Sequence, residues 1–324
     1  TTTLTFLQNF EKGVVYTLQT NNITDLEGNE MLENEFKFGI PETLETGDLI
    51  INEIMFDSNA DSDDYIEIYN RSDKILDLTD VSFVKTSVAN PVEQTIPAGT
   101  VVFPRSYIAF AANPAALGAY FSVPAGSRIE AINFGTFFTN DGATIQLIKD
   151  DALFDELTYS SKWHHPLIAS VKGVALERIN PGVPTQSPDS WHSASSETNY
   201  GTPGYKNSQY VDVTSSSESR KIVWTEPEVF SPDNDGTDDV CAIHYNTGET
   251  GYAANIIIFN AAGERVYQLA SNALLQPEGF FLWDGSTDRG TNVNPGIYVI
   301  FFQAFNPATG KRIESKTPVA VSSR

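Results

Sequence analysis

The chain has 324 residues, a hydrophobic content of 40% and a formal net charge of −22 at pH 7. Its length suffices for two or three domains with sizeable cores, and its composition is that of a globular protein. The acidic balance excludes a surface that attracts the backbone of DNA or RNA, and it also disfavours anionic lipid headgroups. The charge suits a soluble extracellular protein, and it suits divalent cations as well.

Two absences in the sequence narrow the class of protein further. No run approaches the roughly 18 apolar residues that a membrane span requires, so we expect no direct membrane insertion. No signal peptide is present and Thr1–Phe10 already looks like a strand, so we expect a mature fragment of a longer protein. The single cysteine, Cys241, excludes an internal disulfide framework and lies in an alternating strand, which predicts a small core residue.

Hydrophobic periodicity indicates an all-β chain. The period is two almost everywhere, with Gly, Pro, Asn and Asp between the runs, and the best helical candidate is the short stretch Asn113–Phe121. We expect four parts in chain order: a partial domain at residues 1–45, a central domain at 46–207, a Ser-rich linker at 208–221 and a C-terminal domain at 222–324.

The first segment has predicted strands at Thr3–Phe6, Val14–Thr20 and Glu35–Phe38. The motif YTL at Tyr16–Leu18, followed by ITDLEGN at Ile23–Asn29, resembles the closing half of a bacterial Ig-like domain. Three strands cannot close a seven-stranded sandwich, so either further strands lie outside the segment or it docks on its neighbour.

The second segment opens with two alternating runs, Leu49–Met55 and Tyr65–Tyr69, around an acidic loop, which predicts a β-hairpin. Asn140-Asp141-Gly142 is a tight-turn signal between strands. The order of INE, DDYIEIYNRS, DLTD, IPAGTVVFPRSYIAFA, GVALERINP and GTPGYKN resembles a lamin-tail domain, and this resemblance implies an Ig-like β-sandwich.

The third segment follows a flexible Ser-rich linker, Val213–Ser219. Its motifs FSPDNDGTDD, IFNAAGERV, WDGSTDRG and NPGIYVI resemble the FlgD-like Ig domain and related C-terminal domains of Bacteroidetes surface proteins. The resemblance implies that this domain serves type IX export or attachment. The whole chain is therefore expected to form serial Ig-like β-sandwiches.

The loop at residues 231–239 is the sharpest candidate metal site. Alternate carboxylates on a turning loop can converge on one hard cation, and Ca²⁺ takes six to eight oxygen ligands. The alternative is a solvated acidic turn. The candidate calcium ligands are the side chains of Asp233, Asp235, Asp238 and Asp239, with the Thr237 carbonyl as an extra.

A second, weaker cation candidate is the tip of the opening hairpin, where carboxylates crowd within eight positions and repel one another unless solvent, a cation or a base relieves them. The alternative is a mobile polar tip. The carboxylates concerned are Asp57, Asp61, Asp63 and Asp64.

Glu53 and Glu67 are the best pair of carboxylates for acid–base chemistry, but we expect no catalytic role. Glu67 alternates with Ile66 and Ile68, so the structural interpretation is that it faces solvent or hydrogen-bonds a loop. No nucleophile motif, P-loop or HExxH sequence is present.

The only cluster of imidazoles is Trp163-His164-His165, with His192 as a further candidate. Adjacent strand residues point to opposite faces, which disfavours a shared metal, so a surface loop with a buried tryptophan is expected. Trp163, Tyr159 and Trp191 offer a sugar-stacking platform, with core packing as the alternative.

These features predict a non-catalytic scaffold or interaction protein, secreted or on the outer surface of a Bacteroidetes-like bacterium, with Ca²⁺ as its one candidate cofactor. Its expected partner is a protein or glycan at the cell surface, bound in part through exposed strand edges, and no nucleic acid. The alternatives are an accessory C-terminal region of an exported hydrolase (nuclease, phosphatase or protease) and a glycan-binding module. The sequence leaves the oligomeric state open.

Overall fold

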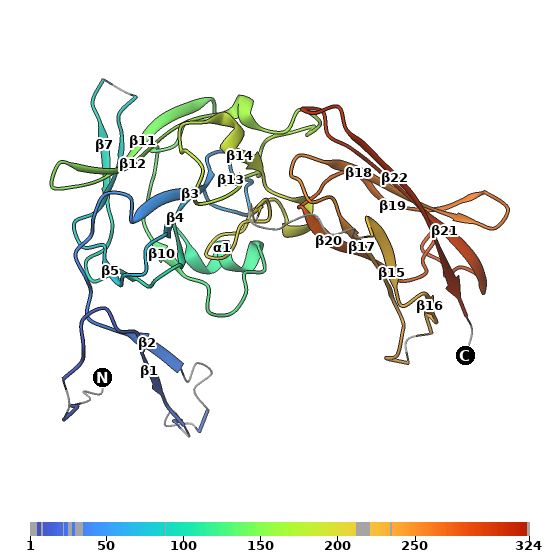
Figure 1. Cartoon of the computed structure of the whole chain (residues 1–324), viewed down its shortest axis with the longest axis horizontal. Coiled ribbons are helices and arrows are strands. Elements are labelled where there is room, and N and C mark those ends of the chain that lie inside the picture. The colour runs from blue at the N-terminus through green and yellow to red at the C-terminus, as the bar shows by residue number, and fades with distance from the viewer. Residues whose placement is uncertain are drawn as a thin grey trace.

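The structure is a computed structural model that describes residues 5–7, 9–21, 23–24, 28–29, 35–87, 89–211, 221–233 and 235–322. Within these residues the regular structure is almost entirely β, with one α-helix and three short 3-10 helices, arranged as sandwich-like domains in series (Figure 1). The prediction of an all-β chain of serial sandwiches is confirmed.

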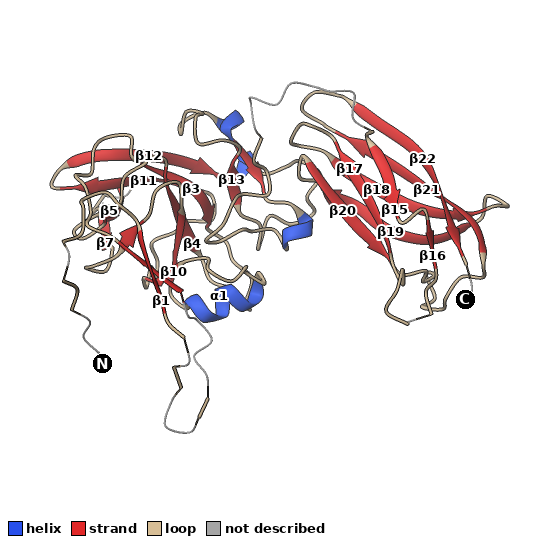
Figure 2. Ribbon diagram, turned by 60° about the horizontal axis from the view of Figure 1, so that its bottom comes forward, coloured by secondary structure: helices blue, strands red, loops and turns tan. Residues whose placement is uncertain are grey.

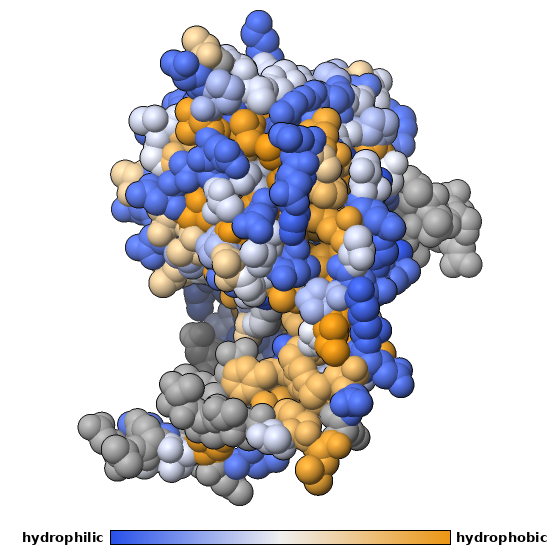
Figure 3. All heavy atoms as spheres, turned by 90° about the vertical axis from the view of Figure 1, so that its left-hand side faces the viewer, coloured by the Kyte–Doolittle hydropathy of each residue, from blue (hydrophilic) through white to orange (hydrophobic). Residues whose placement is uncertain are grey.

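The N-terminal segment forms a two-stranded antiparallel sheet of β1 (Tyr16–Gln19) and β2 (Glu35–Phe38). Four aromatic rings pack around this sheet with centroids 4.8–6.1 Å apart; they belong to Phe6, Phe10, Tyr16 and Phe38. Figure 3 shows apolar side chains gathered on this lower lobe. Parts of the predicted Thr3–Phe6 strand and of the Ile23–Met31 motif lie outside the described residues.

Two packed sheets and a small strand pair build the central sandwich. A buried apolar cluster fills the space between the two large sheets and includes Ile54, Phe110 and Leu147. In spatial order, the six-stranded sheet contains β10 (Ile129–Ala131), β9 (Tyr107–Ala111), β4 (Tyr65–Asn70), β3 (Leu49–Met55), β13 (Leu176–Arg178) and β14 (Trp191–Ser193); the four-stranded sheet contains β12 (Ala152–Ser160), β11 (Gly142–Lys149), β6 (Ser82–Lys85) and β7 (Val92–Thr95); and the pair is β5 (Leu76–Asp77) with β8 (Val101–Val102).

Strands β3 and β4 are buried at every position, because both faces of the six-stranded sheet are covered. The four-stranded sheet covers one face. On the other face a second apolar cluster, which includes Met55 and Tyr65, packs against Leu117 and Phe121. An alternating strand in an antiparallel sheet usually leaves one face to water. The alternation of apolar residues in β3 and β4 therefore does not predict that the second face of this sheet is covered as well.

The helix α1 (Pro114–Tyr120) forms where the sequence predicts it. Asn113 caps its first turn by accepting a hydrogen bond from the Ala116 N–H, and Pro114 occupies the first helical position, where its missing N–H costs nothing. Leu117 is the buried residue of the helix and anchors it on the sheet.

The predicted tight turn at Asn140-Asp141-Gly142 is confirmed, because the Gly142 N–H donates to the Thr139 carbonyl over 3.2 Å. Asn140-Asp141-Gly142 leads into β11 from a loop, whereas the hairpin turn that joins β11 to β12 is Asp150-Asp151. Both of these aspartates have positive φ, 47° and 62°, as a two-residue hairpin turn with the natural strand twist requires. Aspartate tolerates this conformation better than most residues, so glycine was not needed there.

The C-terminal sandwich packs a three-stranded sheet on a five-stranded sheet around a core that includes Ile243, Trp283 and Phe302. Cys241 is fully buried, as predicted. In spatial order the first sheet contains β15 (Val223–Glu226), β17 (Cys241–Asn246) and β20 (Glu278–Trp283), and the second contains β16 (Val229–Phe230), β22 (Arg312–Val321), β21 (Gly296–Phe305), β18 (Ala253–Asn260) and β19 (Arg265–Leu274).

The two sandwiches lie side by side and meet at one end of each (Figure 2). The junction contains the short helices and loops between β13 and residue 211 on the central side, together with one end of β19 and β20. Of the linker predicted at residues 208–221, residues 212–220 lie outside the described part of the chain, and Ser208 and Gln209 are buried. The described residues contain no helix that is long and apolar enough to cross a membrane.

Candidate functional site

Three glutamates form a row across the middle of the six-stranded sheet. Glu177 on β13 is the register partner of Glu53 on β3, and Glu53 is the partner of Glu67 on β4. All three side chains are inaccessible to solvent. Like charges directly opposite on neighbouring strands destabilise a sheet, so this row requires compensation from outside the sheet.

The compensation comes from the segment Gly201–Gln209, which we call the closing loop. The Thr202 N–H donates to Glu53 Oε1 over 2.8 Å, and the Gly204 N–H donates to Glu67 Oε2 over 2.6 Å. The closing loop also reaches Glu177, whose Oε2 accepts from the Gln209 N–H and the Ser208 hydroxyl. The GTPGYKN motif that marks the predicted end of the domain, together with Ser208 and Gln209 after it, therefore donates hydrogen bonds to all three glutamates. Tyr65 and Asn52 on the sheet itself add one bond each, to Glu53 and to Glu67.

The Thr202 hydroxyl lies between two carboxyl groups, 3.0 Å from Glu53 Oε2 and 2.8 Å from Glu177 Oε1. A hydroxyl has one proton to donate, so only one of these groups can accept from it and the other must donate. Glu53 is the group that keeps a proton: burial, and then the charge of Glu177, raise its pKa to about 8. Burial also raises the pKa of Glu67 well above its usual value.

The structure selects between the two interpretations offered for Glu67. The expectation that it faces solvent is wrong, because the closing loop covers that face of the sheet, and the hydrogen bond to a loop is confirmed. Sequence reasoning missed Glu177 altogether. The available signal was a glutamate directly after the apolar run Val174–Leu176 in GVALERINP.

The acidic loop at residues 231–239 brings three of its predicted ligands together. Carboxylate oxygens of Asp233, Asp235 and Asp239 lie within 4.8 Å of one another. Backbone N–H groups hold the loop in this shape: the Thr237 N–H donates to Asp235 Oδ1 over 2.8 Å, and the Gly236 N–H donates to Asp239 Oδ2 over 2.7 Å. Asp239 Oδ1 is buried and forms no hydrogen bond with the described part of the chain.

Asp238 is not in this convergent group, and a contribution from the Thr237 carbonyl stays a prediction. Asp238 has a positive φ of 53°, and its backbone carbonyl accepts from the Ser231 N–H over 2.8 Å, which closes the loop at its base. The three convergent oxygens are the donor type that hard cations prefer, so this group offers three ligands to a metal ion.

The hairpin tip at Asp57–Asp64 does not gather three carboxylates in this way within the described chain. Asp64 Oδ1 accepts from the Ser58 N–H, and Asp63 Oδ2 accepts from the N–H of Asn113, each over 2.8 Å. Burial raises the pKa of Asp64. The tip thus binds the start of α1, and cation binding by Asp57, Asp61, Asp63 and Asp64 stays a prediction.

The histidine cluster is not a surface loop, because His164 is only 7% exposed. Its Nδ1 lies 2.9 Å from the Ser193 hydroxyl, and burial lowers its pKa to about 4. His165 points to the other sandwich, with Nε2 3.1 Å from the Gly251 carbonyl. His192 faces the same junction, and burial lowers its pKa to about 4.

The proposed sugar platform of Trp163, Tyr159 and Trp191 does not exist, and core packing is confirmed. Tyr159 and Trp191 are 2% and 1% exposed, and Trp163 packs against the same core. The guanidinium of Arg178 lies 5.0 Å from the centroid of the Trp191 ring. Buried rings cannot meet a ligand from solvent.

Arg178 is the centre of a second buried network that the sequence did not reveal. It donates from Nε to the Ile51 carbonyl over 2.9 Å and contacts Asp155 Oδ2 at 3.3 Å. Asp155 also accepts from the Ile51 N–H and the Thr185 hydroxyl. Because Arg178 lies on β13 and Asp155 on β12, the ion pair joins the two sheets of the central sandwich.

Polar contacts connect the two sandwiches at their junction. The Ser195 hydroxyl donates to the Leu274 carbonyl over 2.8 Å, and the Gln209 amide donates to the Leu275 carbonyl over 3.1 Å. Glu197 accepts from the Tyr245 hydroxyl and from the Gln276 amide. Burial raises the pKa of Glu197 to about 6.

Two β-sandwiches in series, closed by buried polar networks and docked on each other, define a modular multi-domain β protein. Residues 42–161 match the Lamin Tail Domain family, and residues 224–317 match the CHU_C Type IX secretion signal domain. The chain therefore contains a lamin tail domain followed by a type IX secretion signal domain, as its motifs predict. It is a protein that the type IX secretion system of Bacteroidetes exports to the cell surface or outside the cell.

Among curated proteins, none matches the chain. Matching solved structures include dimeric latent PorU and the type IX secretion component PorZ, both of Porphyromonas gingivalis, at 12% and 9% sequence identity and a TM-score of 0.24 each. The alignments cover 90% and 84% of this chain but 23% and 39% of those proteins. The chain thus spans less than two fifths of the length of either.

Proposed function

We propose that this chain is a non-catalytic interaction region of its exported protein. In this proposal the lamin tail domain binds a protein or glycan partner at the cell surface, and the C-terminal domain serves export or attachment. The observation that carries the proposal is the use of the buried carboxylates: Glu53, Glu67 and Glu177 are all bonded to the closing loop, and none reaches solvent. Acid–base chemistry requires a carboxyl group that a substrate can reach.

An accessory role beside a catalytic domain of an exported nuclease, phosphatase or protease is the alternative form of this proposal. In both forms the two docked sandwiches act as a spacer that carries a binding surface. Neither form assigns catalytic chemistry to these residues. The two forms therefore differ only in what the rest of the protein does.

A reporter experiment tests the proposal. A Bacteroidetes host should display a reporter on its surface when residues 212–324 follow the reporter, and should retain a reporter fused to residues 1–211 inside the cell envelope. The purified chain should hydrolyse no nuclease, phosphatase or protease substrate. Hydrolysis that Glu53→Gln or Glu67→Gln abolishes, in a variant with unchanged thermal stability, would contradict the non-catalytic assignment.

We also propose that the C-terminal domain binds Ca²⁺ through Asp233, Asp235 and Asp239. The convergence of three carboxylates within 4.8 Å supports this second function, and so does the unsatisfied Asp239 Oδ1. The chemistry would be structural: a bound cation neutralises the mutual repulsion of the three groups and holds the entry to β17 in one conformation.

A further inference from the structure

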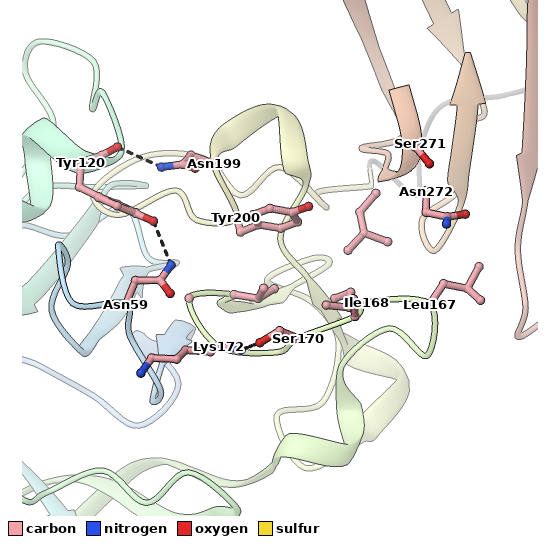
Figure 4. A pocket seen from close by; sticks show the side chains of 14 residues that line it. Asn59, Tyr120, Leu167, Ile168, Ser170, Lys172, Asn199, Tyr200, Ser271 and Asn272 are labelled. Atoms are coloured by element: carbon pink, nitrogen blue, oxygen red, sulfur yellow. Dashed lines mark hydrogen bonds between the residues drawn. The ribbon is translucent and has the colours of Figure 1, made fainter. Parts of the chain in front are cut away.

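A hollow with a volume of about 410 Å³ lies where the two sandwiches meet (Figure 4). Small-ligand sites commonly have volumes of about 300–1,000 Å³ and favour domain junctions. The central sandwich contributes Tyr120, Asn59 and Tyr200 to its wall, and the other sandwich contributes Ser271 and Asn272. Figure 4 places the Tyr200 ring between the two groups.

The backbone of this wall is unusual. Asn199, Tyr200 and Asn272 all have positive φ, at 53°, 66° and 50°. This conformation is strained for a bulky residue such as tyrosine, and such strain is characteristic of sites where a side chain must be presented in one direction. The Ala175 N–H donates a hydrogen bond to the Tyr200 carbonyl over 3.0 Å, and this bond stabilises the conformation.

The charge of the wall differs from that of the molecule. Asp and Glu account for 42 of the 324 residues, yet none of the 14 residues that line the hollow is acidic, and Lys172 is its one charged residue. The remaining polar groups are amides and hydroxyls. Within the described chain, the Asn272 amide and the Tyr200 hydroxyl have no hydrogen-bond partner, so they are available to a ligand.

We propose that this hollow is a binding site for a neutral saccharide. An amide offers a donor and an acceptor side by side, which matches neighbouring sugar hydroxyls, and an aromatic ring packs on the apolar face of a sugar ring. A peptide would be expected to use a strand edge or a helix groove, and the wall is made mainly of loops and turns. The inference rests on the proposed binding role and names its site and ligand class.

The test uses the full chain and hexasaccharides of glucose, xylose, mannose, galactose and N-acetylglucosamine, with a sialylated oligosaccharide as the anionic comparison. Saturation-transfer NMR and titration calorimetry should detect at least one neutral sugar with a dissociation constant of about 1 mM or tighter. Binding of the sialylated sugar alone would overturn the assignment of a neutral ligand. Absence of binding to every sugar would overturn the inference.

Glycine substitutions locate the site without disturbing the backbone, because glycine adopts positive φ freely. Tyr200→Gly and Asn272→Gly should each weaken binding by about tenfold, whereas Tyr200→Phe keeps the ring and should stay within about threefold. Asn90→Ala, at an exposed turn of the central sandwich, is the matched control and should change nothing. Unchanged affinity in both glycine variants would place the sugar elsewhere.

The outcomes also separate this inference from the proposed function. Normal export of the reporter without sugar binding would refute the saccharide site and leave the export role intact. Sugar binding by purified protein without export would do the reverse.

Discussion

Glu53 keeps its proton at neutral pH because it is fully buried and lies opposite Glu177 on the neighbouring strand. Its folded-state pKa of about 8 lies above the usual value of 4.5. The contribution of Glu53 to the free energy of unfolding is therefore complete below pH 4.5, and it is lost as the pH rises through 8. The residue favours the folded state most under acidic conditions.

Replacement of this carboxyl by an amide should remove that pH dependence. Between pH 5 and pH 8 the wild-type Tm is expected to fall, and Glu53→Gln should reduce the size of the fall because glutamine does not titrate in this range. Thermal unfolding followed by circular dichroism measures both slopes. Glu93→Gln, at an exposed position of β7, is the control for the general effect of removing one carboxyl group from an acidic protein. Identical slopes in wild type and Glu53→Gln would contradict the prediction.

The ion pair of Arg178 and Asp155 should contribute far more than any surface pair. Their side chains are 1% and 10% exposed, whereas those of Arg105 and Asp73 are 56% and 84% exposed. Asp155→Ala leaves a buried guanidinium without its partner, so we expect a loss of about 3–5 kcal/mol in urea unfolding. Asp73→Ala is the matched control and should cost far less, because solvent screens that exposed pair. Equal losses would contradict the role of burial.

Among the structural elements, the strands and α1 were predictable because alternation and an Asn-Pro start are local signals. The cover on the second face of β3 and β4 was not, because it depends on contacts between distant residues. Thr202 and Glu53, for example, are 149 positions apart. Glu177 and the Arg178 network were not predicted because their contacts also join residues that are far apart in the sequence. For the same reason Glu67 was expected to be accessible to solvent.

The loop at residues 231–239 is the element whose behaviour should depend on a cation. Added Ca²⁺ should raise the Tm of the C-terminal domain, and a chelator should lower it again, since the cation binds the folded loop in preference to the unfolded chain. Asp235→Ala should reduce the shift. Asp61→Ala, in the other acidic loop, is the control and should leave it unchanged. The same Tm in Ca²⁺ and in chelator would refute the site.

At the scale of the whole molecule, the family motifs predicted two sandwiches but not their docking. Some contacts at the junction are single side chains that meet backbone carbonyls, such as Ser195 with Leu274, and others join two side chains, such as Tyr245 with Glu197. Neither side carries a sequence signal for such a pairing. The candidate saccharide site was hidden for the same reason, because its wall comes from both domains.

Tyr245→Phe should loosen the junction, because it removes the hydroxyl that donates to the half-buried Glu197. We expect faster hydrogen exchange at residues 196–198 and 274–276, measured by mass spectrometry, with little change in the cores. Tyr298→Phe is the matched control, because its hydroxyl donates to the Asn294 carbonyl within one domain. Equal exchange at the junction in both variants would show that the Tyr245 hydroxyl does not couple the domains.

The closing loop has a consequence for how this protein reaches its folded state. The family match ends at residue 161, yet Glu53 and Glu67 take part of their hydrogen bonds, and Glu177 takes its own, from residues 201–209. Until those last residues follow, a chain leaving the ribosome has, among the described residues, only Tyr65 and Asn52 to donate hydrogen bonds to Glu53 and Glu67, and Glu177 lacks its donors. Folding of this sandwich is therefore completed late. A chain that ends at residue 161 lacks the closing loop, so the carboxyl groups of Glu53 and Glu67 stay uncovered.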